Sequence, residues 1–521
     1  MVAIDDPSLF VTDLLANHAR HTPGKPAVVC AGVERSWQQF DRNINRVANT
    51  LQTNGLKKGD KVALLMGNSV EMLEVLFGVV RAGGCVVPLS GLLTADQLAV
   101  LIDDCDAEWG FVSAEFQQRL DSVRGQLNKI ADAHWIAFDF PAHSGTKVTW
   151  TPLASWLEDA SEQHPAVTHS MSDDFNIIYS SGTTGLPKGI VQTHRARQHW
   201  AFSNAIEMGF NAESRALTTT ALYSNGTWLM MLPVLFAGGT LYVMRAFDAA
   251  AFLAMVQQQQ ITHTFMVPAQ YIMVLDQPQL NDVDLSSLKT VLSAGSPLRR
   301  DTKQQIIERI STGLYELYGF SEGFATMLKP HQHAEKFASV GTPVLGFEMR
   351  ILDDAGNECE VGVAGEIAGY GAGLMKEYYK RPQQTAELIW LDQRGRSFLR
   401  SGDIGSVDAD GFLHLLDRKK DMIISGGLNV FPSDVEEIVG KHPMVADVTV
   451  IGVPHEKWGE SCLALIIPAA HAEINEQQII DWANQQLARH QRLYAVEFRD
   501  DFPRNALGKV LKRILREPYW Q

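Results

Sequence analysis

The chain contains the run Tyr179-Ser180-Ser181-Gly182-Thr183-Thr184-Gly185-Leu186-Pro187-Lys188-Gly189, directly after the apolar, strand-like segment 175–178. Glycines let backbone N–H groups approach an anion closely, hydroxyls add further donors, and a lysine adds positive charge. The run therefore predicts a loop that binds phosphate groups. It is not a Walker A loop, because Gly189 rather than Ser or Thr follows the lysine and the glycines are too closely spaced. The alternative is a plain surface turn, where Gly, Ser, Thr and Pro usually cluster.

Around this run, short β-branched segments alternate with amphipathic stretches. Strands are predicted at 61–66, 84–89, 175–179, 189–193, 240–244, 262–267 and 289–293, and helices at 69–82, 194–208, 248–258, 269–275 and 298–311. This alternation indicates an α/β fold in which helices cover layered, largely parallel sheets.

The pattern changes at about residue 340. Glycines and short alternating strands at 348–352, 365–369 and 412–416 predict a barrel-like β segment over about 340–417. Residues 418–521 then predict a small α+β unit, with strands at 446–452 and 461–467 and helices at 433–441 and 476–490. The charged junction at Asp417 is where we expect a hinge. The chain is thus divided into a large domain, 1–417, and a small mobile domain, 418–521.

Length and composition limit the function. A chain of 521 residues is too long for one ordinary core, and its 45% hydrophobic and 20% charged residues are typical of a globular enzyme. The net charge of −15 argues against nucleic-acid binding, so any anion site must be built from local lysines, arginines and helix N-termini. The five cysteines form no CxxC pair, which indicates reduced thiols in the cytoplasm. No apolar run approaches the roughly 20 residues that span a bilayer, and no secretory signal or membrane insertion is expected.

Further motifs follow downstream. They are Ser293-Ala294-Gly295-Ser296-Pro297-Leu298, Glu316-Leu317-Tyr318-Gly319-Phe320-Ser321-Glu322, Ser401-Gly402-Asp403-Ile404-Gly405, Ser425-Gly426-Gly427-Leu428-Asn429 and Pro503-Arg504-Asn505-Ala506-Leu507-Gly508-Lys509. Together with the glycine-rich run, they resemble the adenylate-forming enzymes: acyl- and aryl-CoA synthetases, peptide-synthetase adenylation domains and luciferases. The resemblance covers nearly the whole chain. Ser321 and Asn505 stand where that family usually has threonine.

The resemblance implies a nucleotide site. Its ATP- or AMP-binding residues would be Ser180, Ser181, Gly182, Thr183, Thr184, Gly185, Lys188, Gly295, Ser296, Pro297, Glu316, Leu317, Tyr318, Gly319, Phe320, Ser321, Asp403, Arg418 and Lys509. Tyr318 would lie on the base and Asp403 on the ribose. Mg²⁺ takes hard oxygen ligands and one or two carboxylates, and Thr184 and Glu322 would hold it. Taken alone, these motifs also fit a buried tyrosine, a surface glutamate, a strand–helix turn and an Asx turn.

Lys509 would be the catalytic lysine, acting with Glu322 and Thr184. Attack of a carboxylate on the α-phosphate brings two anions together, and a cation between them stabilises charge that exists only in the transition state. The alternative for this motif is a solvated basic helix. The resemblance makes Asp417 the hinge, and Ser425, Gly426 and Gly427 would border the CoA tunnel once the small domain has turned. By itself, Gly-Gly is more often a turn.

The acid pocket implied by the resemblance consists of Tyr223, Ser224, Asn225, Trp228, Ser293, Ala294, Phe320 and Met327. Ser224 stands where the family usually has the histidine that closes the acyl channel. Methionines and aromatic residues in these segments favour a fatty or aromatic acid, although both are also ordinary core residues. No arginine or lysine lies in these segments, which argues against a dicarboxylate. Arg195 and Arg197 are expected on the solvated face of the helix that follows the phosphate loop.

The hypothesis from sequence is an AMP-forming acid–thiol ligase in the cytoplasm. A carboxylic acid and ATP would give an acyl-adenylate and pyrophosphate, and the CoA thiol would then displace AMP. One alternative is an adenylating enzyme that loads a carrier protein instead of CoA. Another is a nucleotide-binding homologue that has lost catalysis. A homodimer is expected only because symmetric dimers are common.

Overall fold

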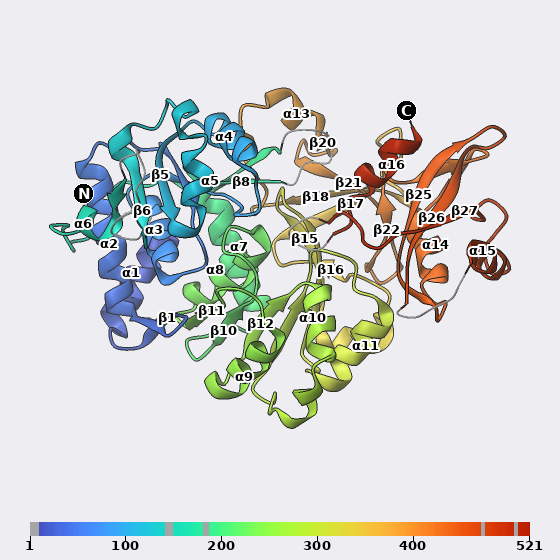
Figure 1. The fold of residues 1–521 in the computed structure, drawn as a ribbon, viewed down its shortest axis with the longest axis horizontal. Coiled ribbons are helices and arrows are strands. Elements are labelled where there is room, and N and C mark those ends of the chain that lie inside the picture. The colour runs from blue at the N-terminus through green and yellow to red at the C-terminus, as the bar shows by residue number, and fades with distance from the viewer. Residues whose placement is uncertain (1–9, 141–149, 181–186, 470–474, 505–508, 521) are drawn as a thin grey trace. The chain divides into compact units, whose positions relative to one another are not determined.

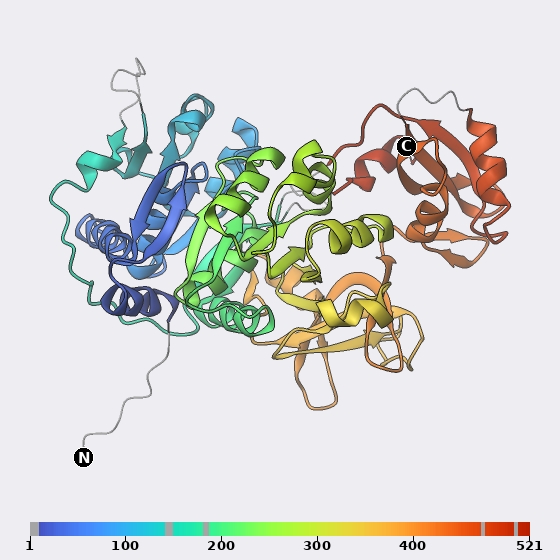
Figure 2. The same cartoon turned by 90° about the horizontal axis from the view of Figure 1, so that it is seen from below.

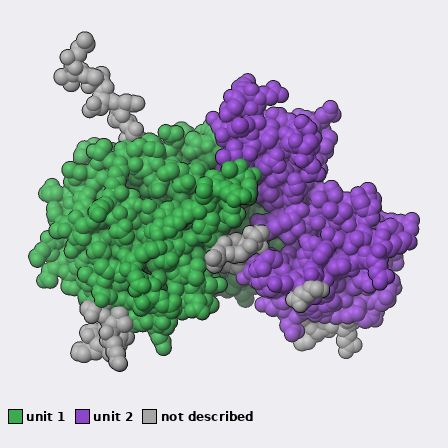
Figure 3. Space-filling view, turned by 90° about the horizontal axis from the view of Figure 1, so that it is seen from above, with its two compact units in different colours: residues 1–333, 343–347, 371–387 green, residues 334–342, 348–370, 388–521 purple. Residues whose placement is uncertain are grey.

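The computed structural model describes residues 10–140, 150–180, 187–469, 475–504 and 509–520. The chain forms two compact units (Figure 3). Unit 1 comprises Met1–His333, Pro343–Phe347 and Gly371–Glu387, and unit 2 comprises Ala334–Thr342, Glu348–Tyr370 and Leu388–Gln521. The domain boundary predicted at residue 417 is a different division of the chain, and it stays a prediction.

Unit 1 contains two large sheets. In the first, the strand order is β15-β14-β13-β12-β10-β11-β1-β2, and the strands from β14 to β1 run parallel to one another. The bounds are β15 (Phe324–Leu328), β14 (Leu314–Phe320), β13 (Thr290–Ser293), β12 (His263–Met266), β10 (Arg215–Thr218), β11 (Thr240–Val243), β1 (Pro26–Cys30) and β2 (Val33–Ser36). Antiparallel strands, β15 and β2, flank the parallel ones.

The second sheet of unit 1 contains the two strands that flank the predicted phosphate loop. Its order is β19-β9-β8-β4-β3-β5-β6-β7. The bounds are β19 (Glu377–Tyr378), β9 (Gly189–Thr193), β8 (Asp174–Tyr179), β4 (Cys85–Pro88), β3 (Lys61–Leu65), β5 (Ala107–Ser113), β6 (Trp135–Phe138) and β7 (Thr151–Pro152). The strands from β8 to β7 are parallel, whereas β9 and β19 are each antiparallel to their neighbour.

Helices lie between the two sheets and on their outer faces (Figure 1). Helix α3 (Val70–Arg81) contacts strands of both sheets, and almost all of its side chains are buried, which explains why its sequence is apolar on every side. Helix α7 (His194–Glu207) packs on β8 and β9, while α8 (Trp228–Phe236) packs on β10, β11 and β12. On the outer faces, α4 (Ala95–Asp104) covers the second sheet, and α9 (Ala249–Gln259), α10 (Pro268–Leu275) and α11 (Arg300–Arg309) cover the first. The predicted layered α/β fold is confirmed.

Unit 2 contains an antiparallel sheet and a C-terminal α+β segment (Figure 2). In the first sheet, β21 (Ser397–Val407) pairs with β18 (Gly365–Gly371), β20 (Ile389–Leu391) and β22 (Leu413–Arg418), and β17 (Phe347–Leu352) lies beside β18. The α+β segment is built from β23 (Ile423–Ser425), β24 (Leu428–Val430), β25 (Val445–His455), β26 (Gly459–Pro468) and β27 (Leu493–Phe498). Helices α14 (Pro432–Val439) and α15 (Glu476–Asn484) share one core with these strands, and α16 (Lys512–Arg516) packs on β25. The predicted barrel-like sheet and C-terminal α+β elements are thus present.

One predicted helix is too long. Residues 476–490 were expected to be helical, but α15 ends at Asn484. The side chain of Asn484 forms two hydrogen bonds with the backbone of Leu493: its Oδ1 accepts from the Leu493 N–H at 2.8 Å, and its Nδ2 donates to the Leu493 carbonyl at 3.1 Å. This pairing turns the chain out of the helix and into β27.

The cysteine thiols are free, and most of them are buried. Cys30, Cys85, Cys105 and Cys462 all lie in the core, and Cys359 is partly buried. Burial raises the pKa of Cys30 to about 11 and that of Cys105 to about 12, so neither thiol is a ready nucleophile. In the part of the chain that the structure covers, none of the helices combines the length and the apolar character needed to cross a bilayer.

Gly323 is required by its turn. This residue lies between β14 and β15 with φ +113°, and a Cβ added there would be 2.2 Å from the Gly373 carbonyl oxygen. Gly55 has a similar φ of +96° but open space around it. We predict that Gly55→Ala lowers the free energy of unfolding by about 1 kcal/mol from backbone strain. Gly323→Ala should lower the free energy of unfolding by a further ~1–3 kcal/mol, because the added methyl group overpacks the turn. Urea unfolding of both variants checks this, and equal losses would contradict the steric argument.

Candidate active site

The predicted phosphate loop joins two antiparallel strands. Strands β8 and β9 pair up to Tyr179 opposite Gly189, and the Ser180 N–H donates to the Lys188 carbonyl at 3.0 Å. The base of the loop is therefore closed as a hairpin, with Ser180 and Lys188 at its two ends. The loop residues Ser181, Gly182, Thr183, Thr184 and Gly185 lie outside the described residues, so their predicted contacts stay predictions.

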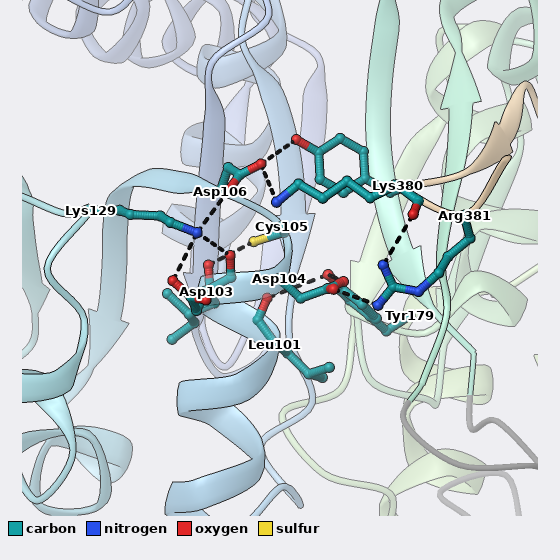
Figure 4. Close-up of polar contacts among 11 residues, drawn as sticks. Leu101, Asp103, Asp104, Cys105, Asp106, Lys129, Tyr179, Lys380 and Arg381 are labelled. Atoms are coloured by element: carbon teal, nitrogen blue, oxygen red, sulfur yellow. Dashed lines mark hydrogen bonds and ion pairs between the residues drawn. The ribbon is translucent and has the colours of Figure 1, made fainter.

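A polar network anchors the strand that enters the loop (Figure 4). The Tyr179 hydroxyl donates to Asp104 Oδ2 at 2.7 Å, and Arg381 contacts Asp104 Oδ1 at 2.7 Å. The Tyr379 hydroxyl donates to Asp106 Oδ2 at 2.8 Å. Burial alone would raise the pKa of Asp106, but hydrogen bonds from Lys129, Lys380 and Tyr379 lower it to about 2. Two carboxylates at the end of α4 thus fix both β8 and the segment after β19.

Tyr378 links the two ends of the predicted phosphate site. It lies opposite Ile190 because β19 pairs with β9. Its buried ring lies 4.6 Å from the Lys188 Nζ, and its hydroxyl donates to Glu322 Oε1. Burial and the Glu322 carboxylate both raise the pKa of Tyr378, so the hydroxyl stays protonated. Sequence reasoning missed Tyr378, although the run Tyr378-Tyr379-Lys380-Arg381 was a usable signal.

The Glu322 carboxylate suits a magnesium ion that is also bound by phosphates. It lies in the turn between β14 and β15, and only its Oε1 is engaged by Tyr378. Mg²⁺ keeps several waters and is usually bound by one or two carboxylates plus substrate phosphates. Among the described residues, no three His, Cys, Asp or Glu side chains cluster so that they could hold a metal. A carboxylate outside such a cluster suits Mg²⁺, which needs few protein ligands, better than zinc, which needs three or four. Thr184, the other predicted ligand, is outside the described residues.

Loops from several parallel strands meet at one edge of the first sheet. Tyr223 and Ser224 follow β10, Ala294 follows β13, and Ser293 is opposite Glu316 in the β13–β14 register. Because the strands are parallel, their carboxyl ends lie at the same edge, where open α/β sheets bind ligands. Gly295 and Pro297 are exposed there, whereas Ala294, Leu317, Tyr318 and Met327 are buried. The structure thus brings most of the predicted adenine and acyl residues to one edge.

Glu316 has a structural partner. Its carboxylate lies 2.6 Å from the Lys303 Nζ, and the two side chains are only 12% and 3% exposed. Burial raises the pKa of Glu316, and Lys303 partly opposes that shift. The nucleotide contact predicted for Glu316 stays a prediction, because the buried ion pair already accounts for this carboxylate.

Arg197 does not lie where the sequence analysis expected it. Arg195 is exposed, as predicted, but Arg197 is only 3% exposed. Its Nε donates to Asn176 Oδ1 at 2.7 Å and its Nη1 to Asn225 Oδ1 at 2.9 Å, and the guanidinium lies 4.4 Å from the Trp228 ring. The prediction failed because α7 lies between two layers and so buries more than one face. A cation therefore contacts two predicted acyl residues, Asn225 and Trp228, which removes the argument against a dicarboxylate.

The predicted ribose and catalytic residues belong to one charged group in unit 2. Asp403 on β21 is opposite Arg418 on β22, with Arg418 Nε 3.5 Å from Asp403 Oδ1. Lys509 is partly buried and interacts electrostatically with both. Burial first, and then Arg418, lower the pKa of Lys509 to about 8, although Asp403 opposes this shift. Hence a lysine that is distant in sequence interacts with Asp403, the predicted ribose ligand, and with Arg418, another predicted nucleotide-binding residue.

Asp417 and the paired glycines have clear local roles. Asp417 Oδ1 accepts from the Arg418 N–H at 2.7 Å and Oδ2 from the Ser433 N–H at 2.9 Å, in the first turn of α14. Gly426 and Gly427 have φ +60° and +80° and join β23 to β24, with Ser425 opposite Leu428. A two-residue hairpin of this kind needs positive φ at both positions. The hinge and the CoA contacts predicted here stay predictions.

The buried Lys303–Glu316 pair gives a prediction on stability. Lys303→Met should lower the free energy of unfolding by about 3–5 kcal/mol, because it leaves a buried carboxylate uncompensated. Adding Glu316→Gln should recover part of this loss. The exposed pair Lys441–Glu437, at 2.9 Å, supplies the control, and Lys441→Met should cost under ~0.5 kcal/mol. Urea unfolding checks the set; no recovery in the double variant would contradict the argument.

Comparisons with known proteins agree with this geometry. The family model for the AMP-binding enzyme matches residues 15–379, and that for the AMP-binding enzyme C-terminal domain matches 434–509. The chain is 32% identical to a feruloyl-CoA synthase from Amycolatopsis sp, over 96% of this chain and 97% of that protein. It is also 32% identical to an indoleacetate–CoA ligase from Aromatoleum aromaticum, over 97% and 98%. The crystal structure of ATP-bound MatB from Rhodopseudomonas palustris superposes with a TM-score of 0.87 at 27% identity, covering 98% of this chain and 99% of that one. As the motifs predicted, the chain belongs to the family of AMP-binding, adenylate-forming enzymes.

Proposed function

We propose that this protein is an ATP-dependent carboxylic acid–CoA ligase that activates an aromatic or fatty acid. Full-length similarity to proteins named as CoA ligases supports this function. The observation that carries it is the charged group of Asp403, Arg418 and Lys509. A carboxylate can hold the ribose of ATP. An ammonium beside it can stabilise the negative charge that develops when the acid attacks the α-phosphate, and desolvation of the ammonium strengthens that attraction.

In the first half-reaction, an oxygen of the acid attacks the α-phosphate, and the bond between the α-phosphorus and the pyrophosphate oxygen breaks. Asp403 accepts hydrogen bonds from the ribose, Tyr318 lies on the base, and Ser180 and Lys188 bind phosphate oxygens. Lys509 carries the positive charge that the two approaching anions need. Glu322 and Thr184 hold Mg²⁺, which screens phosphate charge when it is bound. The products are an acyl-adenylate and pyrophosphate.

In the second half-reaction, the CoA thiol attacks the acyl carbonyl and AMP leaves. The hinge at Asp417 serves this change of partners, and Ser425, Gly426 and Gly427 border the pantetheine. A hinged domain can give one carbon two different surroundings in turn. We also propose a cytoplasmic location, because the cysteines are free thiols.

The direct test is acid-dependent exchange of pyrophosphate into ATP, measured with a panel of fatty and aromatic acids. Exchange followed by a thioester with free CoA supports the proposal. A thioester that forms only on a carrier protein identifies the other acceptor. Background exchange with every acid would overturn the function and favour a non-catalytic nucleotide-binding protein.

Lys509→Ala should abolish adenylation but spare thioester formation from a supplied acyl-adenylate, because the ammonium is needed only where two anions meet. The two half-reactions are measured separately, by pyrophosphate release and by thioester formation. Lys441→Ala, at an exposed lysine of the same unit, should change neither. Survival of both half-reactions in Lys509→Ala would contradict the assigned role.

The pH profile gives an independent control on Lys509. Its pKa of about 8 means that the charge is present below that pH and is lost as the pH rises through it. The kcat/KM for adenylation reports groups of the free enzyme and should therefore fall above about pH 8. Lys509→Arg should keep its charge and extend activity to higher pH, even with a lower maximum. If kcat/KM of Lys509→Arg falls at the same alkaline pH as that of the wild type, Lys509 is not the group that causes the fall.

Tyr378→Phe should weaken the response to magnesium, because it removes the hydrogen bond that orients the Glu322 carboxylate. Loss of a partner behind a metal ligand commonly costs about tenfold or more in metal affinity. The measurement is the Mg²⁺ concentration for half-maximal adenylation. Tyr379→Phe is the matched control, since that hydroxyl bonds Asp106 instead. Equal magnesium responses in the two variants would disprove the link to Glu322.

A further inference from the structure

Arg197 is a buried cation with no acidic partner among the described residues. Its contacts are the side-chain oxygens of Asn176 and Asn225 and the ring of Trp228. Buried charges in proteins are normally paired with an opposite charge, because removing an ion from water is costly. The amide oxygens and the ring compensate this guanidinium only in part.

A second arginine in the same unit does have a carboxylate partner, although its Nε, like Arg197 Nη2, has no hydrogen-bond partner in the described structure. Arg81 is 0% exposed, and its Nη1 lies 2.6 Å from Asp41 Oδ1 and donates to Asn45 Oδ1 at 2.7 Å. Its Nη2 donates to the Thr12 carbonyl at 2.7 Å. The chain therefore gives one deeply buried arginine a carboxylate and leaves the other without one. This contrast indicates that the missing anion at Arg197 comes from outside the chain.

Two donors next to Arg197 have no acceptor. Arg197 Nη2 and Asn176 Nδ2 are both buried without a hydrogen-bond partner in the described structure. They are neighbours, because Arg197 Nε donates to the Oδ1 of the same Asn176 side chain at 2.7 Å. Buried donors are nearly always satisfied. Two adjacent donors, one of them charged, call for an oxygen acceptor and most strongly for an anionic one.

The position of these donors assigns them to the acid rather than to the nucleotide. Arg197 connects β8 of the second sheet, through Asn176, to the loop after β10 of the first sheet, through Asn225. Asn225 and Trp228 lie in the segment where the family resemblance places the acyl pocket, although the sequence of this segment departs from the family's usual one. Trp228 is 2% exposed, and Met230 and Met231, which follow on α8, are fully buried. Arg197 thus lies beside a segment that is rich in buried apolar side chains.

We propose that Arg197 binds an anionic oxygen on the tail of the substrate, so that the enzyme prefers acids with a second carboxylate, or an equivalent acceptor, at the end remote from the activated carboxylate. The apolar side chains would contact the hydrocarbon part of such an acid, and Arg197 with Asn176 would bind its far end. The inference rests on the proposed ligase function and names its substrate class. Specificity of this kind is strong, because an acid without the acceptor leaves buried donors unpaired.

The test compares acids in length-matched pairs, each with one plain member and one ω-carboxylate member. Alkanoates are paired with alkanedioates, and 3-phenylpropanoate with 3-(4-carboxyphenyl)propanoate. Pyrophosphate exchange gives kcat/KM for each, and titration calorimetry gives binding of the acid alone. Wild-type enzyme should prefer the ω-carboxylate member by at least about tenfold. Arg197→Met should lose that preference and gain on plain acids, with the KM for ATP unchanged.

The controls separate a specificity role from a structural one. Arg195→Met changes the exposed arginine two positions earlier on the same helix and should keep the wild-type preference. Arg197→Lys keeps the positive charge but lacks the planar guanidinium, which can donate two parallel hydrogen bonds. This variant should retain part of the preference for ω-carboxylate acids. If Arg197→Met lowers kcat/KM equally for both acids of a pair, Arg197 has only a structural role and the proposal is overturned.

The kcat/KM values of the wild-type enzyme over the acid panel test the inference even if a variant fails to fold. Activation of plain acids as fast as their ω-carboxylate partners would overturn the inference while leaving the ligase function intact, and a buried water would then satisfy the donors. Absence of exchange with every acid would overturn the ligase function, and this inference with it.

Discussion

The structure of unit 1 depends on one constraint, the antiparallel pairing of β9 with β8. The other strands on the β8 side of that sheet run parallel, so this reversal holds both ends of the predicted phosphate loop together. It also gives β19 an edge to pair with. Without that pairing, Tyr378 would not reach Lys188 and Glu322, which lie far from it in the sequence.

The protein is strongly acidic overall, yet the residues predicted to bind its anionic substrates include a few cations in each unit. Lys188 faces an aromatic ring, Arg418 pairs with Asp403, and Lys509 is partly desolvated. The desolvated Lys509 ammonium in particular is less screened by water, so it acts more strongly than a surface lysine would. A net charge of −15 is therefore compatible with binding anionic substrates, because the local field rather than the total charge determines affinity.

Most of the fold could be predicted because the hydrophobic periodicity matches the layers: β9 lies at the predicted 189–193, and α7 ends one residue before the predicted 208. Once the strands are predicted, the motifs in the loops that follow them can be located as well. Arg197 could not, since a charged residue is expected to be solvated and only the packing of α7 between two layers buries it. Tyr378 was missed because strand pairing over a long sequence distance leaves no periodic signal. The end of α15 was missed because a side-chain contact to Leu493 determines it.

The contacts of Asp417 bear on how a hinge at this residue would behave. Its carboxylate holds the Ser433 N–H, and the Ser433 hydroxyl in turn donates to the Leu416 carbonyl. Hydrogen bonds of this kind contribute about 0.5–1.5 kcal/mol each, so a rotation of the backbone at Asp417 that separated it from Ser433 would have to break them. The arrangement seen here is therefore stabilised by one carboxylate and by the serine that it contacts.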